Sequence, residues 1–245
     1  MREWRQFIEL IRKIRRRILR ARYQFVRYIF LSRLIKDKKV LIIGSGLSAK
    51  KLKQIPEGFL VFTCNRGVKL LNDVKFKGTI DLYFTFAHHL RKHKETQENL
   101  QSVKIKIFII DDLNCIKNRP FLNKSYQYLL QDNYYNNRYL EKLIRPQRVY
   151  KLKGSSFPWT SSGMRLLQYA LYFKAKEIYL IGFDLDTKGY FDGQPNQSDH
   201  IDIDNNLMML LVEKYTNIYS LTNSLPDCLV ETGVFPRDFQ NLDII

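Results

Sequence analysis

Short apolar segments recur between residues 39 and 221, and amphipathic or polar segments separate most of them. Segments such as KVLIIG and VKIKIFII are rich in β-branched or aromatic residues and end at glycine or polar residues, which is typical of buried strands. We predict strands over residues 39–44, 59–65, 79–86, 103–110, 177–184 and 217–221.

The longer segments between these strands predict helices. One helix is expected to begin at about Ser48, and others are predicted over residues 88–101, 161–174 and about 203–215. The tyrosine-rich segment 121–150 is predicted to be mainly helical with long loops. The alternation predicts an α/β fold with a Rossmann-like, mostly parallel sheet flanked by helices. Ligands of such sheets bind beyond the carboxyl ends of the strands, so the residues that follow each strand are candidate site residues.

The first 36 residues follow a different pattern, in which apolar residues recur at spacings of three, four or seven. This spacing places them along one stripe of a helix, with arginine and lysine between them. We predict that residues 1–36 form a basic amphipathic helical arm and that residues 37–245 form a single Rossmann-like domain. The stripe consists of Trp4, Phe7, Ile8, Ile11, Ile14, Ile18, Phe25 and Ile29.

The positive charge is concentrated in this arm. The chain has a net charge of +17, and residues 1–39 hold 14 Lys and Arg but only 3 Asp and Glu. A basic amphipathic helix with an early tryptophan favours an anionic membrane surface. Alternatively, the stripe packs on the body or on a second subunit of a homo-oligomer. Nucleic-acid binding is disfavoured, because the body has no helix-turn-helix or RNA-binding signature.

Cysteine usage and hydropathy bear on the compartment. Cys64, Cys115 and Cys228 are far apart and form no CxxC pair, which predicts neither a zinc site nor a disulfide framework and fits a reducing compartment. The sequence shows no secretory signal and no run of about 20 apolar residues that could span a membrane. We therefore expect a cytoplasmic protein.

The first strand runs into a glycine-containing turn that fits the dinucleotide pattern G-x-G-x-x-A. Gly44, Ser45, Gly46 and Ser48 belong to this turn, whose backbone can approach a phosphate. An NAD site also needs a carboxylate after the second strand, where the sequence has Thr63-Cys64-Asn65-Arg66-Gly67. NAD is therefore disfavoured, whereas NADP stays open because Arg66 could meet a 2′-phosphate. The glycines could also serve close packing alone.

Two further polar groups follow strands or precede helices. Thr160, Ser161, Ser162 and Gly163 lie at the start of a predicted helix, where hydroxyls either cap the helix or form an anion or sugar pocket. Asp184 ends the strand 177–184, and Tyr190 lies in the loop after it. A carboxylate at this place is suited to sugar hydroxyls, although it can also cap a turn.

His200 lies in a polar loop just before the helix at 203–215. A neutral imidazole there could accept a proton at physiological pH, although a lone loop histidine is usually only solvated. His88 and His89, after the third predicted strand, are rivals for this role. Together with His93 they could look like a metal cluster. They do not predict a metal site, because His89 and His93 lack the glutamate of HExxH and their helix is very basic.

Taken in order, these motifs resemble the bacterial sialyltransferases of glycosyltransferase family 42. The resemblance covers about residues 40–227, and the hydroxyl-then-glycine group is also similar to a sialylmotif of the animal-type family 29. The matching stretches are VLIIGSGLSAKKL, VFTCNRG, TSSGMRLLQYALYFKAKEIYLIGFD, GYF, and His200 followed by LLVEKYTNIYSLTNSLPD.

The resemblance implies a variant of the GT-A fold and a metal-independent, inverting transfer of sialic acid from its CMP ester to a sugar hydroxyl. It places the turn from Gly44 to Ser48 against the ribose and phosphate of the donor and makes Asn65 a donor-binding residue. It implies that Tyr190 donates a hydrogen bond to the departing phosphate and that His200 is the general base. The donor pocket would further contain Ser161, Ser162 and Gly163. We also expect Arg66, Thr160 and Asp184 to bind the donor.

Two positions depart from the family pattern. Trp159 stands where the family has an arginine, and Asp186 stands near the place of a second tyrosine. CMP-Kdo, which shares the 2-keto acid, is therefore an alternative donor to CMP-sialic acid. The expected acceptor is lipooligosaccharide or capsule at the inner face of the bacterial plasma membrane, where the arm would hold the enzyme. An NADP-linked oxidoreductase and a basic nucleic-acid-binding protein are the alternative functions.

Overall fold

The computed structural model describes residues 28–55, 57–117, 119, 122, 124–131, 160–185, 189–193 and 201–220, together with Trp4, Glu9, Ile11, Ile14 and Arg15. Seven strands of the described part form one sheet. They are β1 (Lys39–Ile43), β2 (Phe59–Cys64), β3 (Thr79–Thr85), β4 (Lys104–Ile110), β5 (Tyr126–Gln131), β6 (Glu177–Ile181) and β7 (Ile218–Ser220).

The strand order is β5-β4-β3-β2-β1-β6-β7, and every neighbouring pair is parallel. The chain therefore adds strands outward from β1 in one direction and then returns to add β6 and β7 on its other side. In register, Leu41 of β1 lies between Val61 of β2 and Tyr179 of β6. The loops that follow β1 and β6 lead away to opposite faces, which makes their junction the switch point of the sheet.

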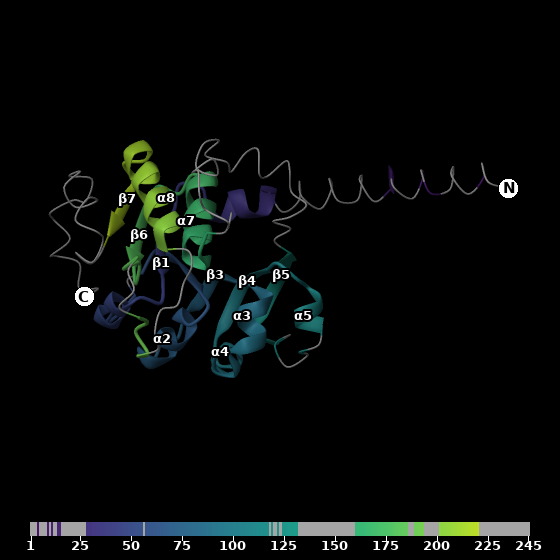
Figure 1. Cartoon of the computed structure of the whole chain (residues 1–245), viewed down its shortest axis with the longest axis horizontal. Helices are drawn as coiled ribbons and strands as arrows, with labels where there is room; N and C mark the ends of the chain where they lie inside the picture. Colours follow the sequence, from purple (N-terminus) through teal and green to yellow (C-terminus); the bar gives the residue numbers. More distant parts are fainter. Residues whose placement is uncertain are drawn as a thin grey trace.

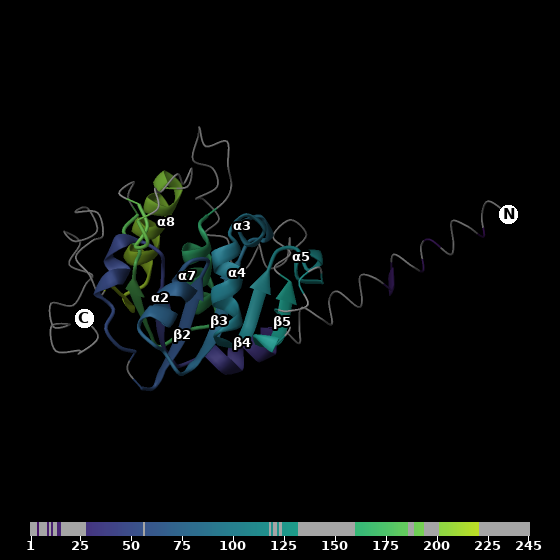
Figure 2. The same cartoon turned by 90° about the horizontal axis from the view of Figure 1, so that it is seen from below.

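Helices cover both faces of the sheet (Figures 1 and 2). A helix over residues 28–35 packs on one face together with α7 (Ser162–Tyr172) and α8 (Ile201–Lys214). The other face carries η1 (Leu47–Lys51), α2 (Gly67–Asp73), α3 (Ala87–Lys92), α4 (Lys94–Gln101) and α5 (Asn114–Lys117).

The alternation of side chains along β1 shows how one strand contributes to both cores. Val40 and Ile42 are buried under α7 and α8, whereas Leu41 and Ile43 are buried on the opposite face. A parallel strand covered on both sides has no solvated face, which is why its sequence reads as a continuous apolar run. The structure confirms the predicted α/β fold with its parallel sheet and flanking helices.

Three predicted helices differ from the observed ones. The helix expected from about Ser48 is the five-residue 3-10 helix η1, which ends because Leu52 adopts an extended conformation. The helix predicted over 88–101 is divided into α3 and α4, because His93 is extended between them. The helix predicted over about 203–215 is α8, which begins two residues earlier.

The helical prediction for the tyrosine-rich segment is wrong over β5. There Tyr128 pairs with Ile107 of β4, and the Tyr126 ring packs on Phe108 with a centroid distance of 5.6 Å. Aromatic side chains suit a pleated surface, and an open edge of a strong sheet overrides local preference. The rest of the segment, residues 132–150, lies outside the described residues.

Candidate active site

A pocket opens at the switch point, where the loops after β1 and β6 meet the start of α7 and α8. Nine of the predicted site residues line it: Gly44, Ser45, Gly46, Asn65, Ser161, Ser162, Gly163, Asp184 and Tyr190. Sequence reasoning did not select the remaining lining residues, which are Cys64, Gly182, Phe183, Leu185, Gly189, Ile201 and Asp204. The predicted site residues Ser48, Thr160 and Arg66 do not line the pocket.

The glycines of the first loop are required by its close approach to β6. The Gly44 amide donates to the Ile181 carbonyl at 2.8 Å, and the Gly46 amide donates to the Gly182 carbonyl at 2.9 Å. A Cβ atom on Gly44 would lie 2.3 Å from the Gly182 carbonyl oxygen, and one on Gly46 would lie 2.7 Å from the Asp184 carboxyl carbon. Packing of two loops therefore accounts for both glycines.

Asp184 fixes this contact with its buried carboxylate. One oxygen accepts a hydrogen bond from the Ser48 amide at 2.8 Å, and the other accepts from the Ser48 hydroxyl. The Gly182 amide in turn donates to the Ser48 hydroxyl oxygen at 3.1 Å. Ser48 does not line the pocket, but its hydrogen bonds connect the first loop to Asp184. Asp184 itself forms part of the pocket wall.

Asn65 stands at the carboxyl end of β2 with a φ of 45°, a left-handed conformation that asparagine tolerates. Its side-chain amide donates to the Ser162 hydroxyl at 3.1 Å, and its carbonyl oxygen accepts from the Thr85 hydroxyl at 2.9 Å. The Tyr83 hydroxyl donates to the Asn65 backbone carbonyl at 3.1 Å. Asn65 is therefore held in the pocket wall by β3 and α7.

The hydroxyl-rich group forms the beginning of α7. Ser161 caps the helix by accepting from the Met164 amide at 3.3 Å, which confirms the capping interpretation for this residue. A Cβ atom on Gly163 would lie 3.1 Å from the Phe183 ring, so close packing accounts for that glycine. Thr160 is buried, and its hydroxyl has no hydrogen-bond partner among the described residues.

Asp204 in the first turn of α8 is a pocket residue that sequence reasoning missed. Its side chain is almost fully buried and accepts from the Ser161 amide at 3.0 Å. Burial raises the pKa of the Asp204 carboxyl to about 6, whereas the hydrogen bonds from Ser161 lower it. The available signal was its spacing from Leu207, Met208 and Leu211, which places a carboxylate on the buried stripe of the helix.

Cys64 is a second missed lining residue, and its thiol is protonated at neutral pH. Burial, and to a smaller extent the nearby Asp204 carboxylate, raise the pKa of this thiol to about 12. A thiol of that pKa forms almost no thiolate at neutral pH, so Cys64 is unsuited to act as a nucleophile. It acts as a small apolar side chain of the pocket wall.

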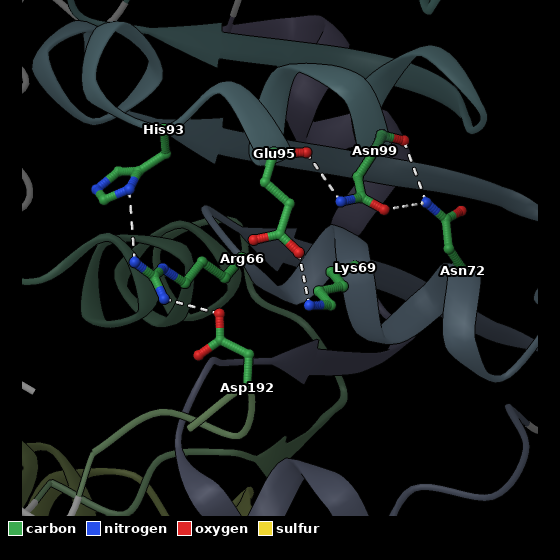
Figure 3. A network of polar contacts seen from close by, with 7 residues as sticks. All are labelled: Arg66, Lys69, Asn72, His93, Glu95, Asn99 and Asp192. Carbon is green, nitrogen blue, oxygen red and sulfur yellow. Dashed lines mark hydrogen bonds and ion pairs between the residues drawn. The ribbon is translucent and has the colours of Figure 1, made fainter. Parts of the chain in front are cut away.

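Arg66 lies beside the pocket, in the turn after β2. Its guanidinium forms an ion pair with Asp192 at 2.7 Å and stacks on the ring of Tyr190, with 5.1 Å between the guanidinium carbon and the ring centroid. Figure 3 shows Arg66 between Asp192 and His93. Its charge is therefore compensated by a carboxylate of the loop that follows β6.

The three histidines after β3 lie on and beyond α3, with the rings of His89 and His93 4.2 Å apart. Burial, together with the neighbouring His93 and Arg66, lowers the pKa of His89 to about 3. His89 is therefore neutral at physiological pH. Within the described residues, no group of three or more His, Cys, Asp or Glu side chains is arranged to hold a metal ion.

His200, Trp159 and Asp186 lie outside the described residues, so their predicted roles stay predictions. Ile201, the first described residue of α8, lines the pocket and immediately follows His200 in the chain.

No family model matches the sequence, and no curated protein matches it. Solved structures resemble it, among them the sialyltransferase CST-II in complex with a trisaccharide acceptor and CMP, with a TM-score of 0.52 and 19% identity over 85% of this chain and 89% of that chain. An α-2,3-sialyltransferase from Campylobacter jejuni in its apo form gives a TM-score of 0.47 and 21% identity over 81% and 79% of the two chains.

The likeness to CST-II shows that the chain has the fold of a sialyltransferase. The resemblance inferred from the order of the motifs is thereby confirmed at the level of the fold.

Proposed function

We propose that the chain is an inverting glycosyltransferase that moves sialic acid, or the related Kdo, from its CMP ester to a glycan hydroxyl. The observation that carries this proposal is the pocket at the switch point, which gathers nine residues predicted from separate motifs. The solved structure that shares the fold contains CMP and a trisaccharide acceptor. A pocket of this kind at the carboxyl edge of a parallel sheet is the usual place for a nucleotide.

The chemistry of the reaction fits the groups that surround the pocket. The donor carries its leaving group on a tertiary carbon, so its transition state resembles an oxocarbenium ion. CMP leaves as a phosphate monoester, so its departure needs hydrogen bonds more than it needs a strong acid. Tyr190 and backbone amides can donate such hydrogen bonds. His200 would remove the proton from the acceptor hydroxyl. As the resemblance implies, we propose that the transfer needs no metal ion.

The NADP-linked alternative has less support in the site. The Arg66 charge that could meet a 2′-phosphate is already paired with Asp192. The nucleic-acid alternative depends on the arm alone, since the pocket is not formed by basic side chains.

We further propose that the arm binds an anionic membrane surface and brings the enzyme to a lipid-linked acceptor such as lipooligosaccharide or capsule precursor, on the cytoplasmic side. The described stripe residues Trp4, Ile11 and Ile14 are all exposed. No helix in the described part of the chain is long and apolar enough to cross a bilayer.

Donor binding is tested by the substitution Asn65→Asp. Aspartate tolerates the left-handed backbone and keeps the acceptor for Thr85, but it places a negative charge in the pocket beside the expected phosphate. We expect the variant to lose at least tenfold in CMP affinity by calorimetric titration, because like charges in a partly buried site repel.

The matched control is Asn72→Asp, which makes the same chemical change at a hydrogen-bonded asparagine of α2 outside the pocket. It should bind CMP like the wild type. NADPH is titrated in parallel, and binding of NADPH without binding of CMP would favour the oxidoreductase and contradict the proposal.

A further inference from the structure

The loop of residues 189–193 closes one side of the pocket, and the side chain of Phe191 anchors it in the hydrophobic core. Gly189 and Tyr190 line the pocket, whereas Asp192 does not. The loop meets the first loop through an antiparallel bridge between Tyr190 and Gly46 and through the Phe191 amide, which donates to the Ser45 carbonyl at 3.0 Å. The position of Tyr190 therefore depends on how firmly this short loop is held.

A nearly buried ion pair between Arg66 and Asp192 holds the loop on its other side. The side chain of Arg66 is 14% exposed and that of Asp192 is 3% exposed, and their atoms Nη1 and Oδ2 are 2.7 Å apart. A charged hydrogen bond that is shielded from water is stronger than the same hydrogen bond on an exposed surface. The same guanidinium covers the face of the Tyr190 ring. The side chain of Arg66 thus contacts both Tyr190, which lines the pocket, and Asp192, which does not.

Arg66 is itself well positioned for this task. It follows Asn65, whose backbone and side chain are fixed by Tyr83, Thr85 and Ser162, and it precedes α2. On the far side, its Nη2 atom is 3.4 Å from Nδ1 of His93 (Figure 3). Arg66 is thus anchored to the sheet, and its guanidinium reaches across to Asp192.

We propose that Arg66 is a positioning residue, whose ion pair with Asp192 and stacking on Tyr190 hold the loop 189–193 so that the Tyr190 hydroxyl faces the leaving group. The proposal rests on the proposed function, because it assumes that Tyr190 assists departure of CMP. It differs from the expectation that Arg66 binds the donor directly, since Arg66 acts here through Tyr190.

The experiment compares Arg66→Ala and Asp192→Asn with the wild type. Turnover is measured as CMP release from CMP-sialic acid and from CMP-Kdo, and CMP affinity is measured by calorimetry. We expect each variant to lose about tenfold in kcat while the Kd for CMP changes by less than twofold. The double variant should be no worse than the worse single variant, because the two residues act through one contact.

A second readout follows the loop itself and does not require turnover. Hydrogen exchange of the peptide that contains residues 189–193 should become at least tenfold faster in both variants, since the loop then holds the Phe191 amide less firmly against the Ser45 carbonyl. Arg66→Lys keeps a charge for Asp192 but loses the planar stack, and it should give an intermediate result. Lys69→Ala is the control: it removes the neighbouring Lys69–Glu95 ion pair and should leave exchange and turnover unchanged.

Three outcomes would overturn the proposal. If the hydrogen exchange of the loop stays at the wild-type rate in both variants, the ion pair does not hold the loop. Faster exchange with unchanged kcat means that the position of the loop does not serve catalysis. A loss of CMP affinity larger than the loss in kcat means that Arg66 contacts the donor. Wild-type protein without CMP binding or turnover would refute the proposed function instead, and the exchange result would still report on the contact.

Discussion

Asp184 and Asp204 are both buried carboxylates of the pocket wall, and they serve the fold in different ways. Asp184 accepts two hydrogen bonds from Ser48 and so joins the loops after β1 and β6. Asp204 accepts from the Ser161 amide and so joins the first turn of α8 to the start of α7. The pKa of Asp204 is raised to about 6 by burial, which makes its contribution to stability depend on pH.

The sign of this pH dependence follows from which state, folded or unfolded, binds the proton of Asp204 more tightly. The pKa of the folded Asp204 carboxyl is about 6, above the usual 3.8 of an aspartate, so the folded state binds the proton better. This contribution stabilises the protein at low pH and is lost as the pH rises through 6. Asp204→Asn removes the titration but keeps an acceptor for Ser161. Relative to the wild type, the variant should gain roughly 2 kcal/mol in the free energy of unfolding between pH 4.5 and pH 7.5.

Urea unfolding of both proteins at the two pH values measures this gain. Asp202→Asn removes an exposed carboxylate from the same helical turn and controls for the loss of one negative charge. A difference between Asp204→Asn and the wild type that stays constant with pH would contradict the account of this residue.

Among the elements, the junction of β1 and β6 shows what a motif can and cannot reveal. The pattern G-x-G-x-x-A correctly marked a strand that ends in a tight turn. The same pattern could not reveal what the glycines contact, because Gly182 and Asp184 are more than 130 residues away in the chain. The choice between close packing and phosphate approach was therefore open in the sequence, and the structure shows the packing.

The helix over residues 28–35 divides the predicted arm into two parts. Leu31 and Ile35 are fully buried in the core under α7, and the Tyr28 ring packs on Tyr172 and Phe173. The arm before this helix includes the exposed Trp4, Ile11 and Ile14. The end of the arm therefore packs on the body through Leu31 and Ile35, which lie outside the predicted stripe, and the membrane proposal concerns the residues before this helix.

Removal of residues 1–27 should therefore separate membrane binding from folding. We expect the truncated chain to keep its melting temperature and its affinity for CMP, but to lose sedimentation with vesicles that contain phosphatidylglycerol, because basic residues near the surface contribute about 1 kcal/mol each. The wild type should also be released by high salt.

Removal of residues 1–36 is the matched control. It deletes Leu31 and Ile35 from the core, and each such loss typically costs about 2–5 kcal/mol, so this chain should unfold or melt much earlier. Vesicle binding that persists without residues 1–27 would contradict the role proposed for the arm.

At the scale of the whole molecule, the arrangement of the sheet brings the motifs together. The first loop, Asn65, the start of α7 and the loop after β6 are far apart in the chain but follow parallel strands or precede a helix at the same edge of the sheet. That rule was available from the strand pattern, and nine pocket residues followed from it. Asp204 escaped this rule because it lies within a helix: its spacing marks it as buried on α8, but its contact with the start of α7 depends on tertiary packing.

The errors in the predicted elements have the same origin. β5 pairs with an exposed strand edge that no local pattern reveals, and the break at His93 accompanies a contact with Arg66 that joins two separate loops. Local preference decides a segment only where tertiary contacts do not compete with it.

The central claim is tested most directly by CMP release from CMP-sialic acid and CMP-Kdo, measured side by side with and without an oligosaccharide acceptor, for the wild type and His200→Ala. We predict that CMP is released from at least one of the two donors and that the acceptor stimulates this release. His200→Ala should still bind CMP but transfer about 10²–10⁴-fold more slowly, since a general base contributes about that factor. If neither donor is consumed, or if His200→Ala matches the wild type, the proposed mechanism is wrong.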